Sequence, residues 1–301
     1  MKQKDWLFII LILVMTTFFR PEESVFANEN KTFFIPFEEH SLFRPYPKKN
    51  SNLELSASSY LSVLVDGNGE KVLFSKNINE RRSIASLTKL MTGIIVLENF
   101  NLEERISISK KSVNTFGIMG QLKDGEAILA RDLLDVMLIE SSNDAAEAFA
   151  ESTGRDKFIK LMNKKASQIG MKDTLFVNPS GLDFDYSNVS NISDLKKLVT
   201  YVIDQYPLIY QILSIKEKDL YNNNVFHHKM ITTNVLLYEN NGYIWGKTGY
   251  TVKAGECIIL LMKRPFSNKE NSYIINIIIN SNERFKDARI MEQLIKESFY
   301  W

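Results

Sequence analysis

Three short motifs occur in a fixed order along this chain, and together they constrain its fold more than any other feature. An S-x-x-K motif lies at Ser86–Lys89, an S-x-N motif at Ser141–Asn143 and a K-T-G motif at Lys247–Gly249. If they form one site, the fold must bring three distant segments together. The residue types suit acyl transfer through an acyl-serine, in which a neighbouring base removes the proton from the serine hydroxyl.

The S-x-x-K motif is weakly specific when it is taken alone, because Ser107–Lys110 and Ser193–Lys196 also match it. Ser86 differs from these copies because the apolar, helix-compatible run Leu90–Leu97 follows it. Positions i and i+3 share one face of a helix, so Lys89 can reach the Ser86 hydroxyl. A lysine can act as the base when burial and a second ammonium lower its pKa. The alternative is a helix start with an exposed lysine.

The other two motifs are also weak singly. S-x-N has two further copies, but only the one at Ser141 lies between two apolar helical segments, where a polar turn would face inward. Helix capping by Asn143 or Asp144 is its alternative role. Lys247 follows a short apolar strand, and its charge beside Thr248 suits a substrate carboxylate. A plain strand end is the alternative there. We interpret the motifs as one site because of their joint order and context.

The hydrophobic pattern predicts strands at both ends of the chain and helices between them. Strands are expected over 60–65, 71–75, 243–248, 256–263 and 272–281, the first two as a hairpin around Asp66–Gly69. Helices are expected over 86–98, 127–140, 144–152, 158–169, 194–206, 208–214 and 284–299. The economical arrangement is an α+β fold, in which an antiparallel sheet is built from both chain ends and carries a helical subdomain.

Composition argues against several kinds of function. The 301 residues are 45% hydrophobic and 24% charged, which is ample material for a core, and a net charge of +1 gives no reason to expect a nucleic-acid partner. Cys257 is the single cysteine, so no intrachain disulfide can form, and no Cys/His cluster has metal-ligand spacing. We interpret the adjacent His227 and His228 as a loop feature rather than a metal site.

Residues 1–27 have the pattern of a signal peptide. Two lysines, Lys2 and Lys4, precede an apolar run of 14 residues from Trp6 to Phe19, and Val25–Ala27 resembles a cleavage site. The run is shorter than the about 20 residues that span a membrane, so we favour cleavage over an uncleaved anchor. In either case the body of the protein is expected to be extracytoplasmic.

The proline-containing stretch 28–57 shows no clean periodicity, and we predict an extended lead-in that lies on the surface or is partly disordered. The catalytic domain is then expected over 58–301.

Longer strings surround the motifs: S-L-T-K-L-M-T-G at 86–93, S-S-N-D-A-A at 141–146, N-P-S-G-L-D at 178–183 and G-K-T-G-Y-T at 246–251. With them the chain resembles the low-molecular-mass penicillin-binding proteins, which are serine-type D-alanyl-D-alanine carboxypeptidases, from about Ser59 to its end. The resemblance implies a β-lactamase/transpeptidase-like fold and cleavage of peptidoglycan stem peptides ending in D-Ala-D-Ala. It also implies covalent inhibition by β-lactam antibiotics such as penicillin, and no metal or other cofactor.

Catalytic roles come with this resemblance. It implies that Ser86 is the nucleophile and Lys89 its general base. It also implies that Ser141 relays a proton toward the leaving amine.

Substrate-binding roles are implied in the same way. Asn143 would hold the substrate's amide carbonyl, Lys247 would supply positive charge and Thr248 would bind the terminal carboxylate. The backbone N–H groups of Ser86 and Tyr250 would form the oxyanion hole, in which one donor is typically worth about 3 kcal/mol.

Two departures from the family pattern matter. Members often have glycine at the centre of S-x-N, whereas Ser142 stands here and is expected to add a hydroxyl near the site. Many members also carry a second, all-β domain and a terminal membrane helix. The chain stops at Trp301, just after the last predicted helix, so we expect neither. Membrane contact is then expected only through the N-terminal segment, if it is uncleaved.

Other functions remain as alternatives. A transpeptidase or an endopeptidase would use the same acyl-enzyme. A class A β-lactamase needs a glutamate for its deacylating water, and no E-x-x-L-N-like segment lies between Asn143 and Lys247. A non-catalytic penicillin sensor would be free to lose a motif, and all three motifs are intact.

Overall fold

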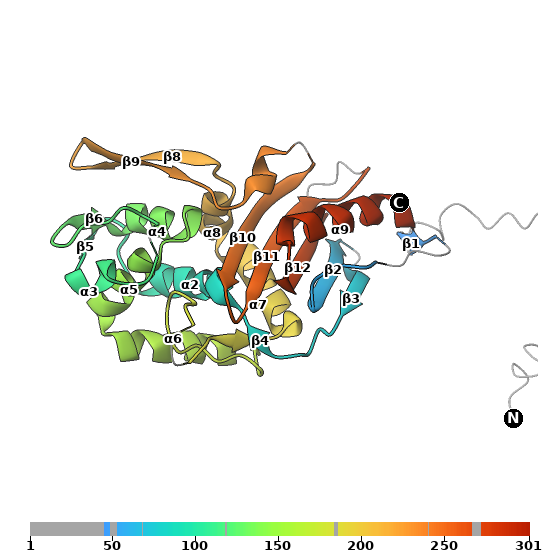
Figure 1. Ribbon diagram of the computed structural model, residues 1–301, viewed down its shortest axis with the longest axis horizontal. Helices are drawn as coiled ribbons and strands as arrows, with labels where there is room; N and C mark the ends of the chain where they lie inside the picture. The colour runs from blue at the N-terminus through green and yellow to red at the C-terminus, as the bar shows by residue number, and fades with distance from the viewer. Residues whose placement is uncertain are drawn as a thin grey trace, which may run out of the picture. The chain divides into compact units, whose positions relative to one another are not determined.

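A five-stranded antiparallel sheet with the strand order β10-β11-β12-β2-β3 forms the centre of the fold (Figure 1). The computed structural model describes residues 45–48, 53–67, 69–117, 119–183, 186–239, 241–266 and 272–301. The strands are β2 (Ser59–Asp66), β3 (Gly69–Lys76), β10 (Tyr243–Thr251), β11 (Gly255–Lys263) and β12 (Tyr273–Ser281). Because β12 pairs with β2, strands from both ends of the described chain meet in one sheet, which confirms the α+β prediction.

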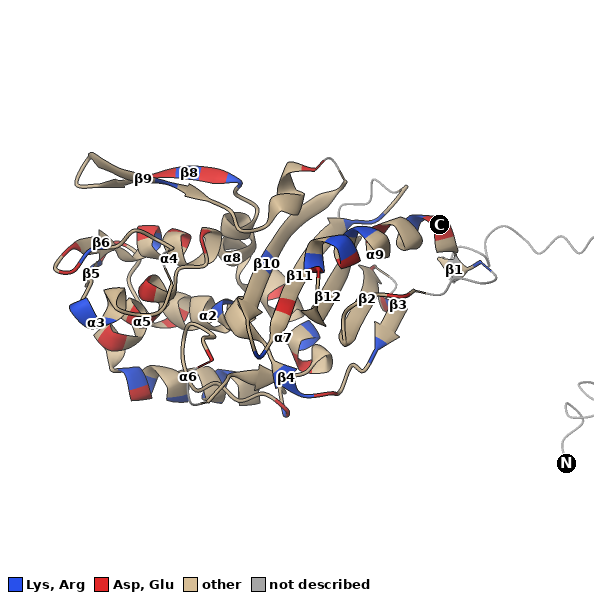
Figure 2. Ribbon diagram, in the orientation of Figure 1, with Lys and Arg blue, Asp and Glu red and all other residues tan. Residues whose placement is uncertain are grey.

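Both faces of the sheet are covered, which explains why its central strand β12 has isoleucines on both faces. Alternate side chains of a strand point to opposite faces. On β12, Ile275 and Ile277 join the larger core with α7 (Ile192–Gln205), whereas Ile274 and Ile278 join a second core with α9 (Arg284–Ser298). Strand β12 carries no charged residue, while α9 carries charges of both signs (Figure 2).

The remaining helices form the predicted helical subdomain beside β10. They are α2 (Lys89–Asn99), α3 (Lys110–Val113), α4 (Ala130–Ile139), α5 (Asn143–Thr153), α6 (Arg155–Gln168) and α8 (Pro207–Leu213). Three of the predicted helix starts are wrong by three residues. Ser86 lies in the 3-10 turn η2 (Ala85–Thr88) that precedes α2, and residues 127–129 form strand β6 (Ala127–Leu129), which pairs with β5 (Arg105–Ser107). Helix α6 begins at Arg155 rather than at residue 158.

One hairpin, β8 (Glu217–Asn222) with β9 (Val225–Ile231), was not predicted. Its turn residues Asn223 and Asn224 have φ of 51° and 63°, the left-handed values that a tight two-residue hairpin turn needs. His227 and His228 lie on β9, so their interpretation as a loop feature is wrong. The hairpin lies beside α4, and η3 (Val235–Tyr238) connects it to β10 (Figure 1).

Short strand pairs close the fold at its edges. Strand β4 (Arg82–Ser83) pairs with β7 (Val189–Ser190), and β1 (Tyr46–Pro47) pairs with β13 (Phe299–Tyr300).

The described end of the lead-in packs against the fold instead of lying free on its surface. The side chain of Asp287 accepts the backbone N–H groups of Ser56 and Ala57 at 3.0 Å each, and Ala57 is 1% exposed. The predicted signal peptide, residues 1–27, and the first part of the lead-in lie outside the described residues. Within the described part of the chain, no helix is both long and apolar enough to cross a membrane.

Candidate active site

The S-x-x-K motif forms a tight turn that brings its serine and lysine together. Ala85 has a left-handed φ of 46°, and Ser86 follows it in the 3-10 turn η2. Lys89 is the first residue of α2, and its Nζ donates to Ser86 Oγ at 2.9 Å. The predicted contact across one helical turn is therefore present, although the turn is 3-10 rather than α-helical.

The buried lysine Nζ has three acceptors. Besides Ser86 Oγ, it donates to Asn143 Oδ1 and to the carbonyl oxygen of Ser180, both at 2.7 Å. Burial lowers the pKa of Lys89 to about 7, against the opposing effect of the nearby Glu147 and Asp144 carboxylates. A lysine with this pKa is substantially neutral near neutral pH, so it can accept a proton from a hydroxyl 2.9 Å away.

The S-x-N motif occupies the turn between α4 and α5. Ser141 has a left-handed φ of 63°, and its Oγ accepts a hydrogen bond from Lys247 Nζ at 2.7 Å. A non-glycine residue in this region costs about 1–3 kcal/mol, so the surrounding contacts must hold the turn in place. Asn143 joins two sides of the site, because its Oδ1 accepts from Lys89 and its Nδ2 donates to the Phe116 carbonyl at 2.8 Å.

Ser142 does not add a hydroxyl to the site, so that expectation is wrong. Its side chain is fully buried, and its Oγ accepts the Ala145 N–H at 3.2 Å as the N-cap of α5. Helix capping at this motif was expected from Asn143 or Asp144, but the residue between Ser141 and Asn143 does it. A serine hydroxyl is among the best N-caps, which accounts for its place here.

The K-T-G motif lies on β10, next to the turn that carries Ser86. Lys247 is 1% exposed, and its Nζ donates to Ser141 Oγ and to the Thr248 carbonyl at 2.8 Å. Burial, and then the charges of Lys89 and Arg284, hold the pKa of Lys247 well below its usual range.

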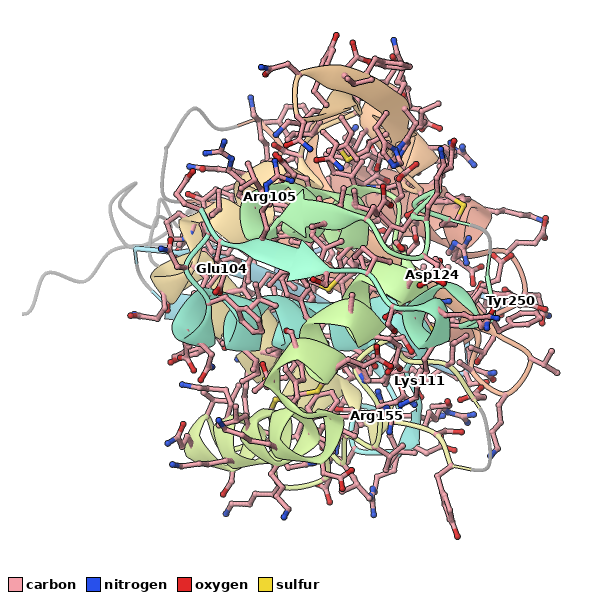
Figure 3. All side chains as sticks on the ribbon, turned by 90° about the vertical axis from the view of Figure 1, so that its left-hand side faces the viewer. Glu104, Arg105, Lys111, Asp124, Arg155 and Tyr250 are labelled. Atoms are coloured by element: carbon pink, nitrogen blue, oxygen red, sulfur yellow. The ribbon has the colours of Figure 1, made fainter. Side chains whose placement is uncertain are left out.

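Glycine is needed in this motif for a close approach. A Cβ on Gly249 would lie 3.0 Å from the Ser86 backbone nitrogen. Thr248 is held by a 2.6 Å hydrogen bond between its Oγ1 and Thr233 Oγ1. The Tyr250 side chain is 61% exposed and projects outward at the edge of Figure 3.

The structure thus joins Ser86, Lys89 and Asn143 in one hydrogen-bonded set and Ser141 and Lys247 in another. The two sets are neighbours, because Ser141 lies two residues before Asn143 and the charge of Lys89 lowers the pKa of Lys247. Thr248 and Tyr250 follow Lys247 on the same strand. The catalytic and binding roles of all these residues remain predictions.

Several groups that support this arrangement were given no role from the sequence. The Ser180 carbonyl binds Lys89, and the carboxylate of Asp183 accepts from Ser83 Oγ at 2.8 Å and from Thr251 Oγ1. Arg284 donates to the Gly249 carbonyl at 3.0 Å. The string at 178–183 was visible in the sequence, but a role played by a main-chain oxygen leaves no mark in the residue type.

Gly181 gives a prediction that tests this support. Its φ is +89°, and an added Cβ would lie 2.0 Å from the Ala85 carbonyl oxygen, directly beside Ser86. We expect Gly181→Ala to displace the turn and to lower the rate of serine acylation by at least about tenfold, because reacting groups must be placed to within about 1 Å.

Gly154 offers a matched control, because its φ is +90° and an added Cβ would meet nothing within 4 Å. Gly154→Ala should therefore lose about 1–3 kcal/mol of stability, because alanine is strained at this φ combined with the ψ of 112° that Gly154 adopts, and it should keep the acylation rate. Thermal unfolding and penicillin acylation of both variants give the comparison. Equal acylation rates in the two variants would show that Gly181 does not hold the serine turn.

Comparison with known proteins gives a consistent result. A family profile described as D-alanyl-D-alanine carboxypeptidase matches residues 47–283. The chain is 35% identical over 229 residues to the D-alanyl-D-alanine endopeptidase of Pseudomonas aeruginosa, covering 72% of this chain and 71% of that protein. It is 32% identical to the D-alanyl-D-alanine carboxypeptidase DacF of Bacillus subtilis, covering 82% of this chain and 63% of that protein.

A solved structure shares the same fold. Penicillin-binding protein D2 of Listeria monocytogenes, in its ampicillin-bound form, aligns with a TM-score of 0.68 at 30% identity, over 82% of this chain and all of that one.

Proposed function

Because the chain belongs to the D-alanyl-D-alanine carboxypeptidase family, and is therefore a serine peptidase, we propose that it removes the terminal D-alanine from peptidoglycan stem peptides. The observation that carries this proposal is the 2.9 Å contact between Ser86 Oγ and the buried Nζ of Lys89. It pairs a nucleophile with a base whose pKa is about 7.

In the proposed reaction, Ser86 Oγ attacks the carbonyl carbon of the penultimate D-alanine while Lys89 Nζ takes the hydroxyl proton. The backbone N–H groups of Ser86 and Tyr250 stabilise the oxyanion that forms. Ser141 passes its hydroxyl proton to the nitrogen of the departing D-alanine and takes up the proton that Lys89 holds, and the carbon–nitrogen bond breaks. Water then gives a proton to Lys89 as it attacks the acyl-serine ester. The ester bond breaks, Lys89 returns that proton to Ser86 Oγ, and the shortened peptide leaves with a new carboxyl group.

Substrate binding falls to the other residues of the site. The 2.7 Å bond between Lys247 Nζ and Ser141 Oγ places the amine close to the proton-relay hydroxyl, and a bound substrate carboxylate would favour the charged form of that amine. That charge and the Thr248 hydroxyl suit the terminal carboxylate of the peptide, and the Asn143 amide suits its backbone carbonyl. A β-lactam presents a carboxylate and a reactive amide to the same groups, so we propose that it acylates Ser86.

The pH dependence of acylation follows from Lys89. Only its neutral form can accept the serine proton, and the neutral fraction rises as the pH passes upward through about 7. We expect the rate constant for acylation by benzylpenicillin to increase through this range and then to level off once Lys89 is neutral. Stopped-flow measurement of that rate constant against pH checks this, and a rate that is already maximal at about pH 5 would rule out Lys89 as the base.

An endopeptidase is the second candidate, and one comparison favours it specifically. The Pseudomonas aeruginosa relative carries that name, and the chain covers 71% of its length, against 63% of the carboxypeptidase DacF. The same acyl-enzyme would then form on the D-alanyl residue of a cross-link between two stem peptides.

The deciding experiment offers the purified protein a diacyl-Lys-D-Ala-D-Ala tripeptide and, separately, a cross-linked muropeptide dimer. Released D-alanine supports the carboxypeptidase, and conversion of dimer to monomers supports the endopeptidase. Hydrolysis of penicillin without peptide cleavage would instead indicate a β-lactamase. Stable penicillin labelling with no peptide turnover would indicate a sensor.

We also propose that the protein is exported by residues 1–27 and acts outside the cytoplasmic membrane, where peptidoglycan lies. The mature chain should then begin near Asn28, and N-terminal sequencing of protein from its native host tests this. A mature protein that starts at Met1 and stays with the membranes after a high-salt wash would instead support an uncleaved anchor, because salt removes electrostatic attachment but not a buried apolar segment.

A further inference from the structure

Four titratable side chains are joined in a row by hydrogen bonds. The row runs from Glu126 through His227 and His228, on the hairpin strand β9, to Glu140, the residue that precedes Ser141. His227 Nε2 contacts Glu126 Oε2 at 3.2 Å, and His228 Nε2 contacts Glu140 Oε2 at 2.8 Å. The two rings meet through their Nδ1 atoms at 2.7 Å. The side chains are 4% to 15% exposed. None of them belongs to the three motifs.

The contacts join the four side chains into one unit. Each ring uses its Nε2 for a carboxylate and its Nδ1 for the other ring, so both nitrogens of both histidines are engaged. The Glu140 carboxylate therefore has His228 as its partner, and His227 and Glu126 hold the His228 ring from the other side.

Glu140 lies directly before the turn that holds Ser141. It is the C-cap of α4, and Ser141 follows it in the left-handed conformation. Two residues after β9, the Thr233 N–H donates to the Ile139 carbonyl at 3.3 Å, and the Thr233 hydroxyl bonds to that of Thr248. The hairpin and the residues that follow it therefore contact both the S-x-N turn and the K-T-G strand.

We propose that His228 is a positioning residue for Ser141, acting through Glu140, and that His227 and Glu126 hold its ring in place. The proposal rests on the catalytic function assigned to Ser141 above. Without the bond from His228 Nε2, the Glu140 side chain loses the partner that fixes the end of α4 directly before Ser141.

The other charged groups around the histidine pair are engaged elsewhere or exposed. On β8, Lys218 pairs with Asp135 of α4 at 2.5 Å. Arg105 of β5 donates to Asn222 at 2.9 Å and also to Asn223, and it lies beside the hairpin in Figure 3.

The charged residues at the nearest loop and strand positions also have other partners or are exposed. Lys229 faces Glu217 at 3.4 Å across the hairpin. Asp124 and Asp219 are exposed. Glu126 itself is held by the Lys123 N–H at 2.6 Å. The carboxylates that contact the two rings are thus those of the flanking Glu126 and Glu140.

The test compares two substitutions that differ in reach. The amide nitrogen of glutamine can occupy the place of histidine Nε2 and donate to Glu140, whereas that of asparagine corresponds to Nδ1 and stops short. Lys229→Ala, on the exposed side of the same strand, is the matched control. For the full chain and each variant, the rate constant for acylation by benzylpenicillin and the thermal unfolding temperature are measured.

We expect His228→Asn to lower the acylation rate constant about tenfold to a hundredfold, because misplacing a reacting group by about 1 Å costs on the order of a hundredfold. His228→Gln should restore the rate constant to within about threefold of the wild type, because it keeps the donor that faces Glu140. Lys229→Ala should match the wild type. If His228→Asn is poorly folded, His228→Gln still decides, because a folded His228→Gln variant that loses about tenfold or more would contradict the role.

Two results would overturn the inference in distinguishable ways. A wild type that reacts with penicillin normally, with His228→Asn and His228→Gln giving the same rates as the wild type, contradicts only the positioning role. A wild type that is inert toward both penicillin and a D-Ala-D-Ala peptide contradicts the proposed function, and the positioning role falls with it.

Discussion

Replacing Ser86 by alanine is expected to eliminate turnover of a D-Ala-D-Ala peptide while the fold remains intact. Without Oγ no acyl-enzyme can form, and removal of a serine nucleophile costs on the order of 10⁶-fold in kcat in well-studied serine peptidases. Ser86 lies in a turn whose backbone contacts do not use its hydroxyl, so the thermal unfolding temperature should change little. Released D-alanine and a thermal melt are the two measurements.

Ser107→Ala is the matched control for this experiment. Ser107 also begins an S-x-x-K sequence, but it is exposed on β5, away from the other motifs. The control should keep full activity. Turnover that survives Ser86→Ala, or that disappears in Ser107→Ala, would move the nucleophile away from Ser86.

The second large effect separates the two buried lysines. Lys89 and Lys247 are both buried, and each contacts a serine hydroxyl, so replacement by the larger arginine imposes a comparable steric cost on both. Arginine stays protonated and cannot act as a base, but it keeps a positive charge. Lys89→Arg should therefore reduce acylation on the order of 10³-fold, within the range of general-base contributions.

Lys247→Arg should be clearly milder, because the group facing the substrate carboxylate only needs to stay charged. Acylation by benzylpenicillin, measured as a second-order rate constant, compares the two variants directly. Equal losses would mean that the two lysines do not divide the roles of base and carboxylate binder in the way proposed.

The sequence predicted the architecture where one physical rule decides the local structure. The isoleucine-rich runs of β11 and β12 are buried on both faces, so they were recognised as strands to within a few residues. The contact between Ser86 and Lys89 follows from helical spacing alone and was also recovered. That the three distant motifs form one site could be predicted without knowing the fold, because their order and local context already indicated it.

The misses have a different physical origin. The turn at Asn223 and Asn224 contains no glycine. Asparagine tolerates left-handed φ, but it is a weaker turn signal than Asn-Gly, and the hairpin that carries His228 was overlooked. The Ser180 carbonyl binds Lys89 through the main chain, which any residue type could supply. Ser142 was placed in the site, because the sequence alone does not show which of adjacent polar residues will cap the following helix.

The most direct test of the account is to locate the covalent adduct of a labelled penicillin. The wild-type protein is incubated with the label, digested and analysed by peptide mass spectrometry. We expect a single labelled peptide with the adduct on Ser86, in the turn that leads into α2. A label on Ser107 or Ser193, or one that persists unchanged in Ser86→Ala, would contradict it.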